Sequence, residues 1–460
     1  MVTCLCLLKF INAKVNIRSI LDFIHFSHPT KEQNLVLNAM ESFVQQENQD
    51  DFLILCGAAG TGKTSLTSAL VGYLNHLGTS YRIAAPTGRA ARIVGKKSKS
   101  SAVTIHSLIY NTKTNENTGV TSFLLKENRN TNFTIFIIDE ASMIPKDKSY
   151  GDSLFETTKG LLFDLVEFIK KGNVQNKIIF LGDRYQLPPI NEITSFALQK
   201  EYIIKTFNFS GESFLLTEVK RQEDGSYILE NATDIRDAMD KNERMHPIQG
   251  KQSNIYQSTS NYIANLKSKG PEDAISIAVS HKANKFFNDL VRDKIFGKAK
   301  KMLENGDFMI VLRNWSRGEF HLYNGDHVQI IDVDWGIQEE VAGLHFVAVK
   351  IKPLFIDKEI IIDDYLILDT LLSENGQIDS QLERALVQQR MIKNPLYRQS
   401  QNPSSDRYVG ALRLGYGHAI TCNKAQGGEW RKVFINCLGI PSLKWQYTAV
   451  TRAKEEIEKF

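Results

Sequence analysis

The eight residues from Gly57 to Thr64, GAAGTGKT, constrain the fold of this chain more than any other segment. They match the pattern G-x-x-x-x-G-K-[ST] in full, which is the signature of a phosphate-binding loop. Residues 52–57, FLILCG, predict a buried strand before the loop, and residues 65–77 predict a helix after it. A Gly-rich turn with a solvated lysine is the alternative, but the strand and the helix on either side disfavour it.

The chemistry of such a loop comes from its backbone and two side chains. Glycines let backbone N–H groups close round phosphate oxygens, and the helix N-terminus adds positive potential. Lys63 is predicted to reach the β- and γ-phosphates, and Thr64 offers a hydroxyl to Mg²⁺. The motif therefore predicts a nucleoside triphosphate and Mg²⁺, held by Gly57, Ala58, Ala59, Gly60, Thr61, Gly62, Lys63, Thr64 and Ser65.

Apolar runs alternate with amphipathic stretches from about residue 35 to 220. Strands are predicted at 52–57, 81–86, 134–139 and 177–182, with helices between them, for example at 161–171. This alternation is typical of a parallel sheet covered by helices on both faces. The 460 residues also exceed the ~250–300 at which single cores stop growing, so we expect two or more domains.

Two adjacent acids follow the predicted strand at 134–138. Asp139 and Glu140 stand at its carboxyl end, where parallel sheets bind ligands. Asp139 is predicted to hold Mg²⁺ through water, and Glu140 to orient and deprotonate the attacking water. Adjacent acids are common on solvated surfaces, so this interpretation depends on the phosphate-binding loop.

The remaining segments predict insertions and a second α/β region. Residues 111–132 are rich in Asn and Thr around VTSFLL, which indicates a β-hairpin insertion. A second α/β region begins near residue 222. Short strands and Asn-Gly turns at 306–370 predict a small β-barrel, and residues 394–408 look like a mobile polar linker. Strand–helix alternation returns at 409–460, so the barrel is inserted into the second α/β region.

Composition limits the class of protein without choosing a function. The net charge of +4 permits nucleic-acid binding but does not argue for it, since only a local groove need be positive. Five cysteines without zinc-finger spacing fit a reducing cytoplasm. The start of the chain has only about ten apolar residues, fewer than the ~20 that a transmembrane helix needs. A signal peptide would have positive charge before its apolar run, and here none precedes it.

In order along the chain, these and further segments resemble the motifs of superfamily 1B DNA helicases of the Dda and RecD types, which pair an AAA-type phosphate-binding domain with a UvrD-like C-terminal domain. The segments that carry the resemblance are PTKEQNLVL at 29–37 (Q motif), APTGRAA at 85–91 (Ia), TIHSL at 104–108 (Ib), IIDEAS at 137–142 (II), GDRYQLPP at 182–189 (III), LTEVKRQ at 216–222 (IV), ITCNKAQGGEW at 420–430 (V) and YTAVTRAK at 447–454 (VI).

The resemblance implies an α/β fold with two RecA-like P-loop domains, ATP in the cleft between them and single-stranded DNA across both. It also implies a small β-hairpin insertion, called 1B, and an SH3-like β-barrel insertion, called 2B. The expected boundaries are 1–27 for an N-terminal extension, 28–220 for domain 1A with 109–133 as the 1B pin, 221–305 for the first part of domain 2A, 306–400 for the 2B insertion and linker, and 401–460 for the second part of 2A.

Site residues follow from the resemblance motif by motif. The catalytic residues it implies are Lys63, Asp139, Glu140, Gln186, Arg221 and Arg452, with the two arginines reaching the γ-phosphate from the second domain. Gln33 is expected to read adenine, and Gly427 and Glu429 to lie near the nucleotide. Gln186 is expected to sense the γ-phosphate within a segment that couples nucleotide to DNA, and Asp183 to orient its turn. The DNA-contacting residues it implies are Pro86, Thr87, Thr104, His106, Phe123, Ser280, His281, Thr421, Asn423 and Lys424.

Several alternatives stay open from the sequence alone. His106 could be a satisfied core histidine, and Phe123 could pack the hairpin onto its own domain instead of stacking on the parting base pair. Asn423 stands where the family often has His, and Gly428 where it often has Ser, which puts details of DNA contact in doubt. Whether Tyr185 touches nucleotide, DNA or only the core also stays open.

The function implied by the resemblance is an ATP- and Mg²⁺-dependent DNA helicase moving 5′→3′ on single-stranded DNA. Its implied partners are single-stranded and forked DNA, with a single-strand-binding protein or other replication, repair and recombination proteins, and it would act without a membrane and as a monomer. The rival functions are a DNA-dependent ATPase that displaces proteins but barely unwinds, and a RecD-like subunit of a recombination complex.

Overall fold

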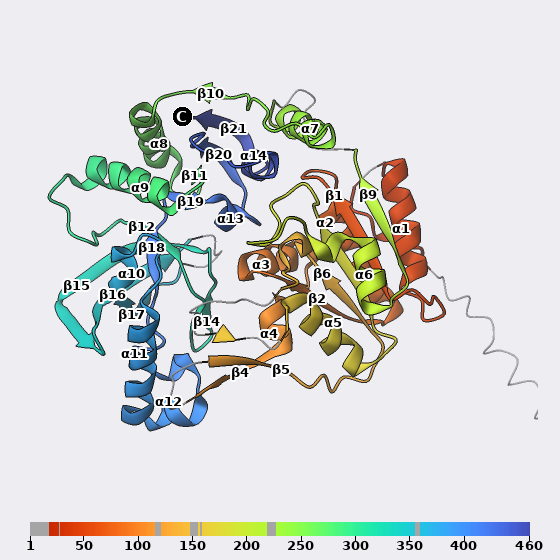
Figure 1. Cartoon of the computed structure of the whole chain (residues 1–460), viewed down its shortest axis with the longest axis horizontal. Helices are drawn as coiled ribbons and strands as arrows, with labels where there is room; N and C mark the ends of the chain where they lie inside the picture. Colours follow the sequence, from red (N-terminus) through yellow and green to blue (C-terminus); the bar gives the residue numbers. More distant parts are fainter. Residues whose placement is uncertain are drawn as a thin grey trace, which may run out of the picture.

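Two parallel sheets and one antiparallel barrel organise the chain (Figure 1). The computed structural model describes residues 18–26, 28–115, 121–147, 155–156, 159–218, 227–354 and 359–460. Within those ranges, no helix has both the length and the apolar character needed to cross a bilayer. The mixed α/β architecture with two RecA-like domains confirms the fold class predicted from the sequence.

The first sheet has six strands in the order β3-β2-β6-β8-β1-β9, and every neighbouring pair is parallel. The strands are β1 (Phe52–Gly57), β2 (Ser80–Ala85), β3 (Ala102–Thr104), β6 (Thr134–Ile138), β8 (Lys177–Gly182) and β9 (Gly211–Leu216). Strands β1, β6 and β8 are buried at every position, as expected for a sheet covered on both faces. The four strands predicted from apolar runs are therefore confirmed.

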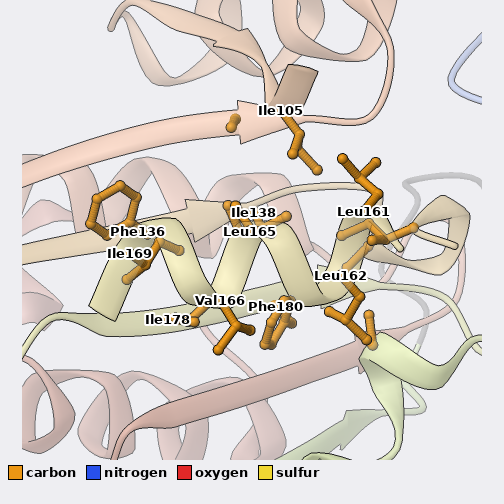
Figure 2. Packing of buried hydrophobic residues seen from close by; sticks show 14 of the residues in the cluster. Ile105, Phe136, Ile138, Leu161, Leu162, Leu165, Val166, Ile169, Ile178 and Phe180 are labelled. Atoms are coloured by element: carbon orange, nitrogen blue, oxygen red, sulfur yellow. The ribbon is translucent and has the colours of Figure 1, made fainter. Parts of the chain in front are cut away.

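Helices cover both faces of this sheet. They are α1 (Lys31–Phe43), α2 (Lys63–Leu77), α3 (Gly88–Ser98), α4 (Ile105–Ile109), α5 (Leu161–Gly172) and α6 (Lys200–Phe207), with short 3₁₀ turns η1 (Ile20–Phe23), η2 (Ala141–Met143) and η3 (Phe196–Leu198). Figure 2 shows one such contact, in which Leu165 and Ile169 of α5 pack against Phe136 of β6. Burying each large apolar side chain contributes roughly 1.5–3 kcal/mol, so this face alone fixes α5 on the sheet.

Part of the expected N-terminal extension belongs to the first domain. Residues 1–17 lie outside the described residues. Ile20 of η1 is buried in the same cluster as α1 and α2, and the Ser19 hydroxyl donates to Glu41 at 2.9 Å. The first domain therefore begins before the Q motif.

The second sheet has five parallel strands in the order β10-β21-β20-β11-β19. They are β10 (Lys251–Gln252), β11 (Ala274–Ala278), β19 (Ala419–Thr421), β20 (Trp430–Ile435) and β21 (Ala453–Lys459). The helices of this domain are α7 (Tyr227–Asp240), α8 (Ile255–Lys269), α9 (His281–Phe296), α13 (Cys422–Ala425) and α14 (Leu443–Val450). The chain leaves this sheet after α9 and returns at β19, so the intervening residues form an insertion.

That insertion is built round a five-stranded antiparallel sheet, which we call the barrel. Its strands are β12 (Phe308–Val311), β15 (His327–Val341), β16 (Leu344–Pro353), β17 (Ile362–Ile367) and β18 (Leu414–Tyr416), with a hairpin of β13 (Trp315–Arg317) and β14 (Phe320–Leu322). The backbone of Leu412 hydrogen bonds to β17, and β18 pairs with β12, so the sheet closes on itself. The sequence-based boundary at residue 400 therefore falls inside this unit.

The segment at 394–408 is folded and is not the mobile linker expected from its polarity. Helices α10 (Asp369–Leu372) and α11 (Ser380–Lys393) precede α12 (Pro395–Ser400) and the 3₁₀ turn η4 (Pro403–Ser405). Asn394 and Asn402 accept hydrogen bonds at the starts of α12 and η4, and Tyr397 is 1% exposed. The polar residues that suggested a linker are helix caps.

A hairpin of β4 (Tyr110–Thr114) and β5 (Thr121–Leu125), joined by β7 (Phe155–Glu156), projects from the first domain. The Phe123 ring lies 5.3 Å from Tyr110 and 5.6 Å from His106, measured between centroids. Phe123 is half-buried against the first-domain core, while its neighbour Leu124 is 42% exposed. This geometry favours the alternative in which Phe123 anchors the hairpin.

Two buried histidines join the barrel to the second sheet. His327 of β15 stacks on Phe308 with ring centroids 4.7 Å apart, and Phe308 also contacts His418 at 5.4 Å. Burial lowers the pKa of His418 to about 3 and holds the pKa of His327 well below its ordinary value. Both rings are therefore neutral in the folded protein at neutral pH.

This burial predicts acid-sensitive stability. Since the folded pKa values lie below the unfolded value near 6.5, each histidine contributes stability that is present above pH 6.5 and lost as pH falls toward the folded pKa. The expected slope is about 1.4 kcal/mol per pH unit for each histidine. We expect His418→Gln to make the fall in Tm between pH 7 and 5 shallower, whereas the exposed control His321→Gln leaves it unchanged; equal slopes would contradict the prediction.

Candidate functional site

A cavity of about 1010 Å³ lies between the two parallel sheets. It is lined by the phosphate-binding loop and by Asp139, Glu140 and Gln186 from the first domain. Gly427, Glu429, Arg452 and Lys454 line it from the second domain. The structure therefore brings together the residues of five separate predicted motifs at the carboxyl ends of the strands.

The phosphate-binding loop has the backbone that anion binding needs. Gly60 and Gly62 adopt φ values of 85° and 91°, a left-handed conformation that glycine tolerates without a Cβ penalty. The Thr61 hydroxyl donates to the Ala58 carbonyl at 2.9 Å and holds the loop closed. Lys63 opens α2, and its ammonium donates to the carbonyls of Gly57 and Ala58.

Gln33 supports the loop from the Q motif. Its side-chain oxygen accepts from Thr30 N–H at 3.0 Å, which caps α1, and its amide donates to the Thr61 carbonyl at 3.0 Å. A Cβ at Gly62 would lie 2.7 Å from this amide, so a side chain at residue 62 would have to displace the Gln33 side chain. Gln33 lines the cleft beside His25 and Phe26, which sequence reasoning did not single out.

Asp139 and Glu140 stand at the end of β6, as predicted. Asp139 N–H donates to Ala84 O at 2.9 Å, and the Asp139 carboxylate accepts from Glu140 N–H at 2.9 Å. Burial raises the pKa of both acids, and for Glu140 the neighbouring Asp139 carboxylate raises it further. A carboxyl group with a raised pKa is a stronger proton acceptor, which suits a general base.

Gln186 belongs to the lining of the cleft. The side chain is 4% exposed, and no donor in the described part of the chain lies within hydrogen-bonding distance of its Oε1. A buried polar atom without a protein partner costs free energy unless a ligand or water satisfies it. Gln186 is therefore a buried group of the cleft lining that has an unused acceptor.

Asp183 connects the same segment to the second domain. It is 1% exposed, and its carboxylate accepts from Tyr185 N–H at 3.0 Å and from the Tyr447 hydroxyl of α14 at 2.7 Å. Burial, followed by the Asp183 charge, raises the pKa of Tyr447 well above its ordinary value, so the hydroxyl stays a donor. The bond joins the two domains beside the nucleotide cleft.

Two further hydrogen bonds reinforce this junction. Leu187 N–H donates to the Thr448 hydroxyl at 2.9 Å, and the Gln426 amide donates to Leu187 O at 2.9 Å. The Tyr185 ring packs against Tyr447 with centroids 6.0 Å apart, and its hydroxyl donates to Asp240 of α7 at 3.1 Å. Tyr185 therefore packs against the second domain, and its contacts with nucleotide or DNA stay a question for experiment.

Arg452 reaches the cleft from the end of α14. Its guanidinium donates to Thr448 O at 3.0 Å and to Gly428 O at 3.2 Å, so its position is fixed. Arg221, the other arginine implied by the resemblance, lies outside the described residues. A Cβ at Gly428 would lie 2.5 Å from the Trp430 ring and 2.9 Å from the Arg89 guanidinium, which explains glycine where the family often has serine.

The DNA-contact candidates of the first domain lie at one edge of the sheet. Ala85 and Thr104 are paired in register on β2 and β3, which places Pro86 and Thr87 beside the start of α4. The hydroxyls of Thr87 and Thr104 cap α3 and α4. Burial lowers the pKa of His106, whose ring packs on Tyr110. These contacts give each residue a structural role beside the predicted one.

The candidates of the second domain gather round a smaller cavity. His281, Thr421 and Lys424 line a space of about 70 Å³ between α9, α13 and the barrel. Ser280 caps α9 by accepting from Ala283 N–H at 3.2 Å, and Asn423 lies on α13. Burial lowers the pKa of Lys424 and of His281.

Sequence reasoning missed one wall of the nucleotide cleft. Helix α3 presents Arg89, Arg92, Lys96 and Lys97 to it, and the barrel contributes Gly325 and Asp326. The spacing of the basic residues in GRAARIVGKKSK places them on one helix face, a signal that could have been found. Asp326 could not, because it is 234 residues away from its partner Arg92.

Comparisons with known protein families agree with the two-domain layout. Residues 37–251 match a family model described as an AAA domain, and residues 416–457 match the UvrD-like helicase C-terminal domain. The chain is 27% identical over 163 residues to the ATP-dependent RecD2 DNA helicase of Deinococcus radiodurans, a match covering 35% of this chain and 20% of that protein. It is 26% identical over 330 residues to the ATP-dependent DNA helicase dda of Enterobacteria phage T4, covering 67% of this chain and 69% of that one.

Solved structures share the fold at low identity. A Pif1 helicase from a study of unwinding at forked double-stranded DNA has a TM-score of 0.51 and 16% identity, covering 94% of this chain and 92% of that one. The Pif1 helicase from Candida albicans has a TM-score of 0.50 and 14% identity, covering 95% of each chain. Together with the sequence matches, these likenesses confirm the resemblance to superfamily 1B helicases.

The domain junction yields a prediction for Tyr447→Phe. The substitution removes the buried hydroxyl that donates to Asp183, and we expect a loss of about 1.5–3 kcal/mol in the free energy of unfolding, measured by urea denaturation. Tyr81→Phe is the matched control, because its hydroxyl bonds to Asn75 and Ser100 near the surface of one domain. Equal losses in the two variants would contradict the role of the junction.

Proposed function

We propose that this chain is an ATP-dependent DNA helicase that moves 5′→3′ along single-stranded DNA and separates duplex DNA. The observation that carries the proposal is the cleft between two RecA-like domains, lined by the phosphate-binding loop on one side and by Arg452 on the other. Hydrolysis in such a cleft changes the contacts between the domains, and this is the movement that a motor needs. The names of the relatives with sequence similarity, both ATP-dependent DNA helicases, support the same function.

The catalytic roles follow from the positions of the side chains. Lys63 and the loop backbone bind the β- and γ-phosphates, and Glu140 accepts the proton of the attacking water. Arg452 stabilises the charge that develops on the γ-phosphate, a role that is worth about 10³–10⁵ in rate where arginine fingers have been measured. We assign the same role to Arg221 by resemblance alone.

The cleft also fits Mg²⁺. The Thr64 hydroxyl and the Asp139 carboxylate both line it, and oxygen ligands from one or two side chains, completed by phosphates and waters, are the usual way proteins hold this ion. Among the described residues no cluster of three His, Cys, Asp or Glu side chains forms a separate metal site. Bound Mg²⁺ would neutralise charge on the β- and γ-phosphates.

Motif III would couple ATP turnover to DNA movement. Gln186 lines the cleft. Its neighbours Asp183 and Leu187 hydrogen bond to Tyr447 and Thr448, which both lie on α14 of the second domain. A change at the γ-phosphate that moves Gln186 therefore moves the junction between the domains. Single-stranded DNA would cross the helix N-termini that carry Thr87, Thr104, Ser280 and Thr421, where backbone N–H groups favour phosphate.

The expected partners are single-stranded and forked DNA, with a single-strand-binding protein or other replication and repair proteins, and the active unit would be a monomer. The nucleic-acid part is supported by the similar fold of a Pif1 helicase studied in unwinding at forked double-stranded DNA. The hairpin β4–β5 would serve as the pin that divides the duplex, with Phe123 as its anchor.

Tailed duplexes test the proposal. We expect release of the labelled strand from a 5′-tailed duplex with ATP and a product trap, little release from a 3′-tailed one, and none from either with Lys63→Ala. Hydrolysis of ATP without strand release would favour a protein-displacing translocase. Hydrolysis that appears only with added recombination proteins would favour a RecD-like subunit.

Phe123 and Leu124 provide a matched test of the pin. Since Phe123 packs against Tyr110 and His106, we expect Phe123→Ala to lower Tm and unwinding together, whereas Leu124→Ala leaves Tm unchanged. Differential scanning fluorimetry and the strand-release assay measure the two effects. Loss of unwinding by Phe123→Ala with unchanged Tm and ATP hydrolysis would restore Phe123 as the residue that stacks on the parting base pair.

A further inference from the structure

The barrel forms part of the wall of the nucleotide cleft. Gly325 and Asp326, in the turn between β14 and β15, line the same cavity as Lys63 and Arg452. The barrel thus meets the first domain at this cavity, although its sequence lies within the second α/β region. A unit that lines a binding site can influence what binds there.

The contact depends on one forked ion pair. Arg92 of α3 donates to both carboxylate oxygens of Asp326, at 2.9 Å and 2.7 Å. The Asp326 side chain is 4% exposed and that of Arg92 is 29% exposed. Such a two-pronged pair fixes orientation as well as distance, because the guanidinium is planar.

The turn that carries Asp326 is held in place by its own backbone. Tyr323 N–H donates to the Asp326 carboxylate at 2.7 Å, and Gly325 N–H donates to Val311 O of the barrel at 2.9 Å. Gly325 has φ 93°, which an L side chain rarely adopts. The carboxylate is therefore presented to α3 on a rigid support.

The barrel and α3 also pack closely at this contact. The Tyr323 ring lies against the start of α3 so closely that a Cβ at Gly88 would come within 2.1 Å of it. The Arg92 guanidinium lies 5.1 Å from the centroid of the same ring. Arg89, on the same helix as Arg92, also lines the cavity. Burial lowers the pKa of Arg89 to about 10, and the Asp326 carboxylate opposes this shift.

We propose that Asp326 is a positioning residue of the nucleotide site, and that it competes with the phosphates of the nucleotide for the guanidinium of Arg92. A guanidinium can fork onto a phosphate as well as onto a carboxylate, and Arg92 lines the cavity in which the phosphates would lie. Binding of a triphosphate then draws Arg92 from Asp326 and loosens the barrel from α3. The inference rests on the proposed binding of ATP.

The test measures the Kd of a fluorescent, non-hydrolysable ATP analogue for the full chain by anisotropy. We expect Asp326→Asn to bind the analogue about 3–10-fold more tightly, since it removes both a negative charge and the competing partner, a change of up to about 1.4 kcal/mol. Arg92→Gln is expected to bind about 3–10-fold more weakly. In the double variant the gain from Asp326→Asn should vanish, because there is no guanidinium left to release.

Arg317 and Asp364 provide the matched control. This pair lies within the barrel at 3.0 Å with side-chain exposures of 24% and 7%, and it does not line the cleft. Asp364→Asn should leave the Kd of the analogue unchanged even if it lowers Tm, which separates positioning from a merely structural role. If Asp326→Asn does not fold, Asp326→Ser takes its place, and the same comparison with and without Arg92 applies.

The outcomes distinguish this inference from the proposed function. An unchanged Kd in Asp326→Asn and Arg92→Gln, with tight binding by the unmutated chain and loss of binding in Lys63→Ala, would overturn the role of Asp326 and leave the ATP site intact. The same gain from Asp326→Asn in the presence and absence of Arg92 would also overturn it. No binding by the unmutated chain would overturn the proposed function, and this inference with it.

Discussion

A buried hydrogen bond between Asp183 and Tyr447 ties motif III of the first RecA-like domain to α14 of the second. A carboxylate that is 1% exposed is tolerated only if donors satisfy it, because an unpaired buried charge costs several kcal/mol. One donor is the backbone of its own turn and the other belongs to the partner domain. The positions of Gln186 and Arg452 across the cleft follow from this junction, since each lies within a few residues of one end of the bond.

Glycines mark the places where the three units approach most closely. At Gly88 the barrel residue Tyr323 occupies the space of a side chain, and at Gly428 the Trp430 ring and the Arg89 guanidinium do so. Arg89 lies 4.7 Å from the centroid of the Trp430 ring, a favourable contact between a cation and an aromatic face. The departure from the family pattern at residue 428 thus has a packing reason in the cleft.

Local patterns predicted the parts of the fold and the site that depend on neighbours in sequence. Strands such as Phe52–Gly57 and the phosphate-binding loop are encoded within a few residues, so apolar runs and glycine spacing suffice. Contacts between distant residues, such as Arg92 with Asp326, have no local signature. The polar composition of residues 394–408 led to the wrong prediction of a mobile linker, because Asn and Asp occur both as helix caps and in loops. The sequence left open whether Phe123 stacks on DNA or anchors the hairpin. Its contacts with Tyr110 and His106 favour the anchor, and these contacts have no signature in the local sequence.

The strengths of these contacts indicate which parts of the molecule can move. Each domain core buries dozens of apolar side chains, and each of them contributes roughly 1.5–3 kcal/mol. The contacts across the cleft are the Asp183–Tyr447 bond of about 1.5–3 kcal/mol, a few hydrogen bonds of about 1 kcal/mol each and a partly exposed ion pair of at most about 1 kcal/mol. A nucleotide present at 100 times its Kd supplies about 2.7 kcal/mol, which is comparable with the strongest of these contacts and far smaller than the stabilisation within either core. A nucleotide that binds one arrangement of the domains more tightly than another can therefore shift the contacts at the cleft, whereas the cores stay folded.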